Sequence, residues 1–403
     1  MYAKKDINFA WPVTTLCKFD YDALRKCVEA NEEVLRQKQI VIFGAGIRGT
    51  SFSLLLQKFG FSDMVFTDNN KEKIGGNIND FPIIPYEEVE TDKEHLVVII
   101  SVENGFSIKE QLEKSGFIEN VNYFYVENHL YDIYMDKFNN NRAIDTLVIG
   151  DCALTDISKG DKDYTNLEEM LEQKLGEDKT KVLAIHGMAL RSFYHILCAH
   201  LQFISIPKTV VIMTNPVTIG KHHLLPRAQH ADLIQVISNA VNNQDSELKD
   251  YVGVTRERFN NLKMDFFTSS QSVLNKMSKD KNDKIVIRLN YMYELKEDNE
   301  CLVYMKKIVD LCRQKNTNLL FFIPPVNYMY AEELYGDLFS EKYQAIVSRI
   351  KMSAEATEIL DLSYSLTDIQ FADIHTITEN MNYEGRQIVA DELVKKIHLM
   401  EVR

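Results

Sequence analysis

The stretch that decides the fold is Thr146-Leu-Val-Ile-Gly-Asp-Cys-Ala-Leu-Thr-Asp156. Its apolar run ends abruptly at Gly150, Asp151 and Cys152, as in a buried parallel strand that stops at a tight turn. Open α/β sheets place their chemistry at the carboxyl ends of such strands. The pattern therefore predicts a parallel sheet that presents Asp151 and Cys152 at its carboxyl edge. A buried core cysteine without chemistry is an equally open interpretation of the same residues.

Further strand patterns follow this stretch and alternate with helical patterns. The strand patterns lie at residues 181–185, 209–214, 318–323 and 358–362, and the helical ones at residues 192–203, 301–315, 341–355 and 386–398. Such alternation is typical of a doubly wound parallel sheet, so we predict an α/β domain over residues 142–403. A largely polar segment, residues 240–300, is predicted to form a helical insertion or cap over the carboxyl edge of the sheet.

A second strand, loop and helix pattern lies near the N-terminus, in Gln39-Ile-Val-Ile-Phe-Gly-Ala-Gly-Ile-Arg-Gly49. Its glycines allow the tight turn and close backbone approach that a phosphate at a helix N-terminus requires. A later strand pattern ends at Asp68, where such folds place an acid that holds a ribose hydroxyl. We predict a Rossmann-like domain over residues 1–125 that binds a nucleotide or nucleotide-sugar, with a scaffold that binds nothing as the alternative. The candidate ligand-binding residues are Gly44, Gly46, Arg48, Gly49 and Asp68.

Composition and charge limit the classes of protein that fit. A chain of 403 residues suits two or three domains, because a domain averages roughly 150 residues. Residues 126–141 are rich in Asn, Asp and Tyr and are predicted to link the two domains. The formal net charge of -13 argues against nucleic acid and anionic membranes as partners, because duplex binding depends on clustered Lys and Arg.

Cysteine and histidine usage bears on metals and on the cellular compartment. The six cysteines form no Cys-x-x-Cys pair, so we predict reduced thiols and no zinc or redox motif. His222, His223 and His230 match no metal-ligand spacing, and no metal is predicted. The N-terminus lacks a signal-peptide core, and no run of about 20 apolar residues occurs. We expect a cytoplasmic protein without membrane insertion, for which a homo-oligomer is allowed.

Three strand ends resemble blocks of the SGNH (GDSL-type) hydrolase and acyltransferase superfamily. Gly150-Asp151-Cys152 resembles the first block, with Cys where the family has its nucleophilic Ser. In that family the nucleophile's own N–H, a Gly and an Asn hold the oxyanion. Gly187 follows the second predicted strand and Asn215 follows the third. The resemblance implies that Cys152 is the nucleophile and that Gly187 and Asn215 hold the oxyanion with its N–H.

The last block of that family is Asp-x-x-His, followed by a Gly and a C-terminal helix. The segment at Gly385 reproduces the Gly and the helix, but the histidine position holds Asn380 and the acid position holds Ile377. The nearby pair Asp373 and His375 stands five residues early. Two interpretations remain open, because loops absorb length changes cheaply. Either an insertion brings Asp373 and His375 to the site, or the site has lost its base.

Two further resemblances concern the biological process. Ile323-Pro-Pro-Val-Asn327 resembles a segment of the D-alanyl-lipoteichoic acid transfer proteins, an SGNH branch, and the rings of Tyr328 and Tyr330 beyond it could stack on a sugar. The N-terminal domain, with Asp68, Lys73 and Gly75, resembles the domain that precedes bacterial sugar acyltransferases.

Together these resemblances imply an acyltransferase or esterase that acts on a sugar hydroxyl in bacterial surface-glycan biosynthesis. Its substrate would be a small molecule or a glycan, and its acyl donor is unidentified. One alternative is a non-catalytic protein that binds a nucleotide-sugar or glycan and carries a degenerate SGNH site. Another, which depends on the glycine loop alone, is a nicotinamide-dependent oxidoreductase.

Overall fold

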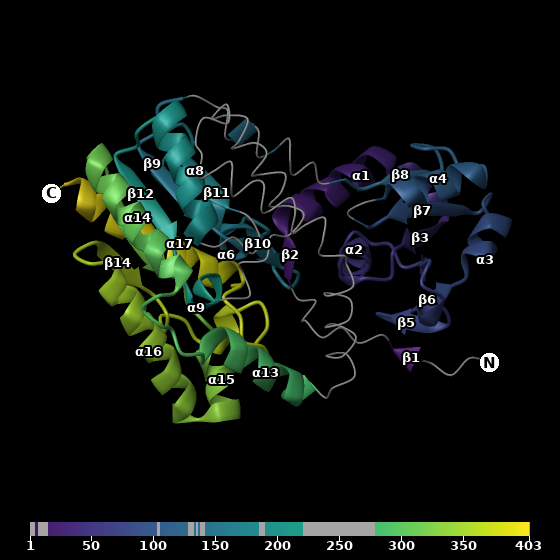
Figure 1. Cartoon of the computed structure of the whole chain (residues 1–403). Coiled ribbons are helices and arrows are strands. Elements are labelled where there is room, and N and C mark those ends of the chain that lie inside the picture. Colours follow the sequence, from purple (N-terminus) through teal and green to yellow (C-terminus); the bar gives the residue numbers. More distant parts are fainter. Residues whose placement is uncertain are drawn as a thin grey trace. The chain divides into compact units, whose positions relative to one another are not determined.

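The computed structural model describes residues 5–6, 15–102, 105–127, 133, 136–137, 142–184, 190–220 and 279–402. The chain divides into two compact units, Met1–Asn128 (unit 1) and His129–Arg403 (unit 2). Each unit combines parallel strands with helices, which confirms the predicted α/β fold class (Figure 1). Most of the predicted insertion at residues 240–300 and part of the predicted linker lie outside the described residues. Among the described helices, none has the length and apolar character that crossing a membrane requires.

Unit 1 is built on a mainly parallel sheet in the order β1-β5-β6-β4-β3-β7-β8. Its strand β3 pairs in parallel with β4 on one side and with β7 on the other. The strand order thus reverses at β3, which in open α/β sheets is where a ligand crevice forms. The elements are β1 (Lys5–Asp6), β2 (Thr15–Cys17), α1 (Lys18–Gln37), β3 (Gln39–Phe43), α2 (Ile47–Lys58), β4 (Met64–Thr67), η1 (Lys71–Lys73), β5 (Gly76–Ile78), β6 (Phe81–Ile84), α3 (Tyr86–Thr91), β7 (Leu96–Ile100), α4 (Phe106–Lys114) and β8 (Tyr123–Tyr125).

Unit 2 contains a five-stranded sheet in the order β11-β9-β12-β13-β14, and every neighbouring pair is parallel. Among the five strands of this sheet, β9 comes first along the chain, and it lies between β11, the second, and β12, the third. The strand order therefore reverses between β9 and β12. The elements are β9 (Thr146–Gly150), α6 (Cys152–Thr155), β10 (Asp156–Ser158), α7 (Leu167–Leu175), β11 (Thr180–Ala184), α8 (Leu190–Phe203), β12 (Thr209–Met213), α9 (Pro216–Ile219), α13 (Lys279–Tyr291), α14 (Glu300–Lys315), β13 (Asn318–Ile323), α15 (Tyr328–Tyr335), α16 (Asp337–Ser353), β14 (Glu358–Asp361), η3 (Asp368–Gln370) and α17 (Tyr383–Glu401).

Helices cover both faces of this sheet, which explains its continuous apolar strands. Val148, Val182 and Val211 share one core cluster with apolar side chains of α7 and α17. On the other side of the sheet, α8 packs against α14 (Figure 1). The consecutive residues Leu147, Val148 and Ile149 are all fully buried. A strand with both faces buried favours an apolar residue at each position, and this is the pattern that residues 147–149 show in the sequence.

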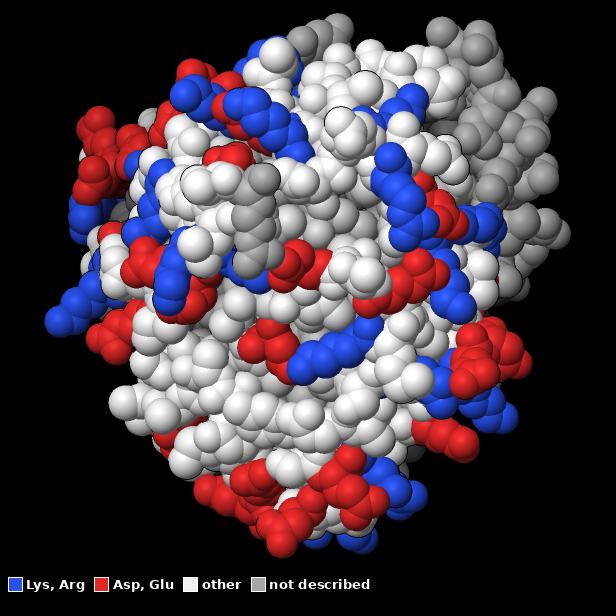
Figure 2. Space-filling model, turned by 90° about the vertical axis from the view of Figure 1, so that its left-hand side faces the viewer, with Lys and Arg blue, Asp and Glu red and all other residues white. Residues whose placement is uncertain are grey.

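Charged side chains of both signs are interspersed on the face of unit 2 that Figure 2 shows, with uncharged surface between them. Many of these charges in unit 2 form ion pairs, such as Lys396 with Glu358 at 2.7 Å and Lys351 with Asp361 at 2.6 Å. Exposed pairs of this kind contribute about 0–1 kcal/mol each. The stability of the unit therefore depends on its buried contacts rather than on these pairs.

Candidate functional site

The carboxyl edge of the unit 2 sheet holds the candidate site, at the point where the strand order reverses. Strand β9 ends at Gly150 and is followed by Asp151 and Cys152, and β12 ends at Met213, two residues before Asn215. Asp151 is 5% exposed and Asn215 is 2% exposed. Ligands of open α/β sheets bind in the crevice outside such strand ends. Three of the residues predicted from the sequence thus follow two neighbouring strands at the edge where a ligand is expected.

A short helix places Cys152 at the end of β9. Asp151 caps this helix, α6, because its Oδ1 accepts a hydrogen bond of 3.1 Å from the peptide N–H of Ala153. A Cβ at Gly150 would lie 2.3 Å from a methyl carbon of Leu154, so a larger residue there would force the Leu154 side chain of α6 to shift. Cys152 is the first residue of α6 and is half-buried.

The other cysteines of unit 2 show how a purely structural cysteine differs from Cys152. Cys301 and Cys312 are 1% exposed, and burial raises the pKa of each thiol to about 12. A thiol with so high a pKa stays protonated at neutral pH and is a poor nucleophile. Cys152, by contrast, is partly open at a strand end. Its position favours the interpretation with chemistry over that of an inert core cysteine.

Asn215 caps α9 in a reciprocal arrangement with Thr218. The Oδ1 of Asn215 accepts a hydrogen bond of 2.6 Å from the Thr218 peptide N–H, and the Asn215 peptide N–H donates to the Thr218 hydroxyl at 3.1 Å. Because Oδ1 is used by the cap, Nδ2 is the group that this amide can offer to an oxyanion. Gly187, predicted as another donor to the oxyanion, lies outside the described residues.

Asp373 and His375 form a turn in the loop before α17. The Asp373 carboxylate accepts a hydrogen bond of 2.8 Å from the peptide N–H of His375, and the imidazole of His375 is exposed. Asn327 fastens this turn, because its Nδ2 donates to the carbonyls of Asp373 and Thr376 at 3.2 and 3.0 Å. The two predicted residues therefore lack the geometry of a histidine that a carboxylate orients.

The tyrosine predicted to stack on a sugar at residue 330 is buried instead. Tyr330 is 7% exposed, its hydroxyl donates to the Asp283 carboxylate, and the Lys279 ammonium lies 5.3 Å from its ring centroid. Both partners come from α13, which packs over the loops at this edge of the sheet. The predicted role of Tyr330 as a sugar platform is corrected by these contacts. Tyr328 is half-buried and packs edge-on against Tyr364.

Glu379 is a residue of this edge that sequence reasoning missed, and it precedes Asn380, which holds the histidine position of the block. Glu379 Oε2 accepts a hydrogen bond of 2.8 Å from the Tyr291 hydroxyl. Burial, and then the charge of Asp151, raise the pKa of Glu379 to about 8. Asn380 Nδ2 donates to Asp156 Oδ2 at 3.3 Å. The loop before α17 thus carries a carboxyl group with a raised pKa and an amide that contacts the residue after α6. The one available signal was that Glu379 directly precedes the histidine position of the block.

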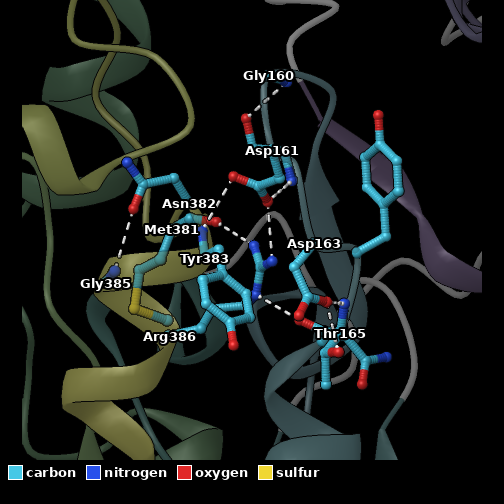
Figure 3. Close-up of polar contacts among 12 residues, drawn as sticks. Gly160, Asp161, Asp163, Thr165, Met381, Asn382, Tyr383, Gly385 and Arg386 are labelled. Carbon is cyan, nitrogen blue, oxygen red and sulfur yellow. Dashed lines mark hydrogen bonds and ion pairs between the residues drawn. The ribbon is translucent and has the colours of Figure 1, made fainter. Parts of the chain in front are cut away.

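A buried ion pair holds this loop against the segment that follows β9. Arg386 is fully buried, and its Nη2 donates to Asp161 Oδ2 at 2.8 Å (Figure 3). The Nη1 of Arg386 donates to the carbonyl of Met381 at 2.7 Å, and its Nε donates to the carbonyl of Thr165 at 3.1 Å. The Tyr383 peptide N–H, at the start of α17, donates to Asp161 Oδ1 at 3.0 Å. The position of Glu379 and Asn380 therefore depends on a satisfied network rather than on a loose loop.

The three glycines of the unit 1 loop differ in whether the fold requires a glycine at their position. Gly44 has a φ of +117°, which L side chains rarely adopt. A Cβ at Gly49 would lie 2.0 Å from the carbonyl oxygen of Gly44, so α2 packs tightly on the turn. A Cβ at Gly46 would meet no atom within 4 Å. The first and third glycines thus serve the fold, and Gly46 faces open space where a ligand can approach the backbone.

The other two residues predicted to bind a ligand in unit 1 are engaged by the protein itself. Asp68 Oδ2 accepts hydrogen bonds from the Ala45 peptide N–H at 2.8 Å and from the Lys73 ammonium at 2.7 Å. Arg48 donates to Asp20 at 3.0 Å and to the carbonyl of Val126 at 2.7 Å. The Arg48 side chain is 12% exposed. Arg48 therefore ties α2 to α1 and to the end of β8, and Asp68 fastens the glycine loop.

The fold and these sites define an α/β protein of two parallel-sheet units, each with polar residues at the carboxyl edge. Within the described ranges, His, Cys, Asp and Glu form no group that could hold a metal ion. A family model described as C2185-like, N-terminal, matches residues 36–121. The match begins at the end of α1, includes the glycine loop and ends before β8, so it lies within unit 1. Among curated proteins, no match is found.

Proposed function

We propose that unit 2 transfers an acyl group to or from a sugar hydroxyl, as an acyltransferase or esterase of bacterial surface-glycan biosynthesis, with Cys152 as its nucleophile. The observation that carries the proposal is the half-buried Cys152 at the point where the sheet order reverses, directly after Asp151 and one strand away from the end that Asn215 follows. The choice of a sugar hydroxyl follows from the resemblance to acyl-transfer proteins of surface polymers.

The reaction follows the general scheme of covalent acyl transfer. The Cys152 thiolate attacks the acyl carbonyl, which forms a C–S bond and leaves negative charge on the carbonyl oxygen. The peptide N–H of Cys152 and the Nδ2 of Asn215 are the donors that would stabilise this oxyanion. Collapse of the intermediate expels the donor's alcohol or thiol with a proton and leaves a thioester. The acceptor hydroxyl, or water in an esterase, then attacks the thioester and restores the thiol.

The proposal is tested with p-nitrophenyl acetate, an activated ester that needs no specific acceptor. Wild-type protein is expected to release p-nitrophenol, and Cys152→Ala is expected to lose this activity. Cys198→Ala is the matched control, because Cys198 is also half-buried but lies on α8. Full activity of Cys152→Ala would reject the covalent mechanism.

The open space at Gly46 supports a second function, the binding of a nucleotide or nucleotide-sugar by unit 1. The loop is followed by the 12-residue helix α2, and helix N-termini favour phosphate groups. Calorimetric titration with a uridine diphosphate sugar and with NAD tests this function. Heat from the sugar nucleotide alone supports it, and heat from NAD alone supports the oxidoreductase alternative. Nucleotide-sugar binding together with an inert Cys152 would favour the non-catalytic binding protein.

A further inference from the structure

We propose that Glu379 is the proton-transfer group of this site and stands in for the histidine that the resembling family uses. The inference rests on the function proposed above and names the residue that completes its chemistry. It replaces Asp373 and His375, whose geometry serves a turn. Glu379 comes from the same loop, close to the expected position in the block.

The contacts of Glu379 fit a group that exchanges protons. Its Oε2 is held by the Tyr291 hydroxyl at 2.8 Å. Its Oε1 is buried and takes no hydrogen bond from another residue within the described part of the chain. A buried carboxyl oxygen without a partner is costly unless a ligand or a proton satisfies it. One oxygen of Glu379 is therefore oriented, and the other is left for a reacting group.

Three titratable groups, each from a different segment of the chain, face Glu379. Asp151, at the end of β9, raises its pKa through its charge. Tyr291, at the end of α13, donates the hydrogen bond, and its own pKa is raised by burial and by the charges of Glu379 and Cys152. Tyr343 of α16 stacks on Tyr291, with ring centroids 6.5 Å apart. The Cys152 thiol and the Glu379 carboxyl are thus both among the groups that raise the pKa of Tyr291.

The loop carrying Glu379 is fixed at both ends. Phe371 and Met381 form a bridge, and the Ala372 peptide N–H donates to the carbonyl of Asn380 at 2.9 Å. Asn380 in turn donates to Asp156, directly after α6. A proton-transfer group must hold its place relative to the nucleophile, and these contacts tie Glu379 to the segment that carries Cys152.

The raised pKa of Glu379 fits a role in proton transfer. Burial and the charge of Asp151 raise the pKa of Glu379 to about 8, so a carboxyl that is normally ionised is available as both acid and base at mildly alkaline pH. Asp151 and Glu379 form a carboxyl pair in which one member is neutral near neutral pH, a pattern that in other enzymes marks the acid and base.

The proton balance of the reaction is complete with this one group. Ionised Glu379 takes the proton of the Cys152 thiol as sulfur attacks the carbonyl carbon. The resulting carboxylic acid gives that proton to the departing oxygen or sulfur of the donor. In the second half, Glu379 takes the proton of the acceptor hydroxyl, or of water, and returns it to the Cys152 sulfur as the thioester C–S bond breaks.

The test is the rate of Cys152 acetylation by p-nitrophenyl acetate between pH 6 and pH 10. Wild-type protein is expected to acylate faster as the pH rises, with a midpoint near the pKa of Glu379, about 8. Glu379→Gln is expected to lose about 100-fold in rate at pH 8, the usual contribution of a positioned base, and to lose that midpoint. Glu384→Gln, an exposed carboxylate at the start of α17, is the matched control and should behave as wild type.

Tyr291→Phe provides a second variant that keeps the ring and the carboxyl. The Tyr291 hydrogen bond lowers the pKa of Glu379, so its removal should move the midpoint to higher pH. A Glu379→Gln protein with wild-type rate and midpoint, or an unmoved midpoint in Tyr291→Phe, overturns the inference alone. Absence of any acetyl group on Cys152 in wild-type protein overturns the proposed function, and the inference with it.

Discussion

The Arg386 guanidinium and the Asp161 carboxylate form an ion pair at 2.8 Å with side-chain exposures of 0% and 4%. The pair joins α17 to the segment after β10. Removal of one partner leaves a buried charge without compensation, which costs about 3–5 kcal/mol. We expect Arg386→Ala to lower the free energy of unfolding by that amount in urea titrations. Arg313→Ala, which removes a 63% exposed side chain from surface pairs, should change it by less than about 1 kcal/mol. Equal losses of unfolding free energy in the two variants would show that the buried ion pair contributes no more to stability than the exposed ones.

Substitutions at two glycines of the unit 1 loop are expected to have different effects, one on stability and the other on ligand binding. Gly44→Ala is expected to destabilise the protein by about 1–3 kcal/mol, because its φ is +117° and a Cβ would lie 2.7 Å from Val102. Gly46→Asn should fold normally, because residue 46 caps α2 in an extended conformation and has open space around it. Thermal unfolding checks both expectations. If unit 1 binds a nucleotide, Gly46→Asn should lose that binding in titration, and unchanged affinity would place the ligand elsewhere.

His200 makes the stability of unit 2 depend on pH. Burial, and then the charge of Lys181, lower the pKa of His200 to about 4. The unfolded chain therefore binds a proton below about pH 6.5 that the folded protein refuses. Stability from this group is present above pH 6.5 and is lost as the pH falls toward 4. At pH 5 the loss is about 2 kcal/mol.

Urea unfolding of wild type and His200→Gln at pH 7 and pH 5 isolates this loss, because the opposite contribution of Glu379, whose pKa is raised to about 8, is common to both proteins. His200→Gln, which does not titrate, should lose correspondingly less stability between the two pH values than wild type. The pKa of Lys181 is also lowered, to about 8, but that titration lies outside this pH window. An identical pH dependence in wild type and His200→Gln would contradict the assignment to His200.

The fold was accessible from the sequence because its strands are buried on both faces. A fully buried strand such as β9 leaves a continuous apolar run, and the end of the run marks the carboxyl edge directly. Asp151, Cys152 and Asn215 could be located for this reason. Strand β10 was missed, because three residues beginning with an aspartate carry no such signal.

Glu379 could not be recognised in the same way, because its chemistry depends on residues far away in the chain. Its burial, the charge of Asp151 and the hydrogen bond from Tyr291 arise only when three distant segments pack together. The protein partners of Arg48 could not be recognised from the motif for the same reason. The motif shows a cation beside a phosphate loop, but Asp20 and the carbonyls that use its donors lie outside the motif.

The most direct test of the account is the identity of the residue that carries the acyl group. Wild-type protein would be mixed with p-nitrophenyl acetate, quenched with acid within the first turnover and digested for peptide mass mapping. The account predicts an acetyl group on Cys152, which vanishes in Cys152→Ala and forms much more slowly in Glu379→Gln. An acetyl group on another residue, with Cys152 unmodified, would contradict it.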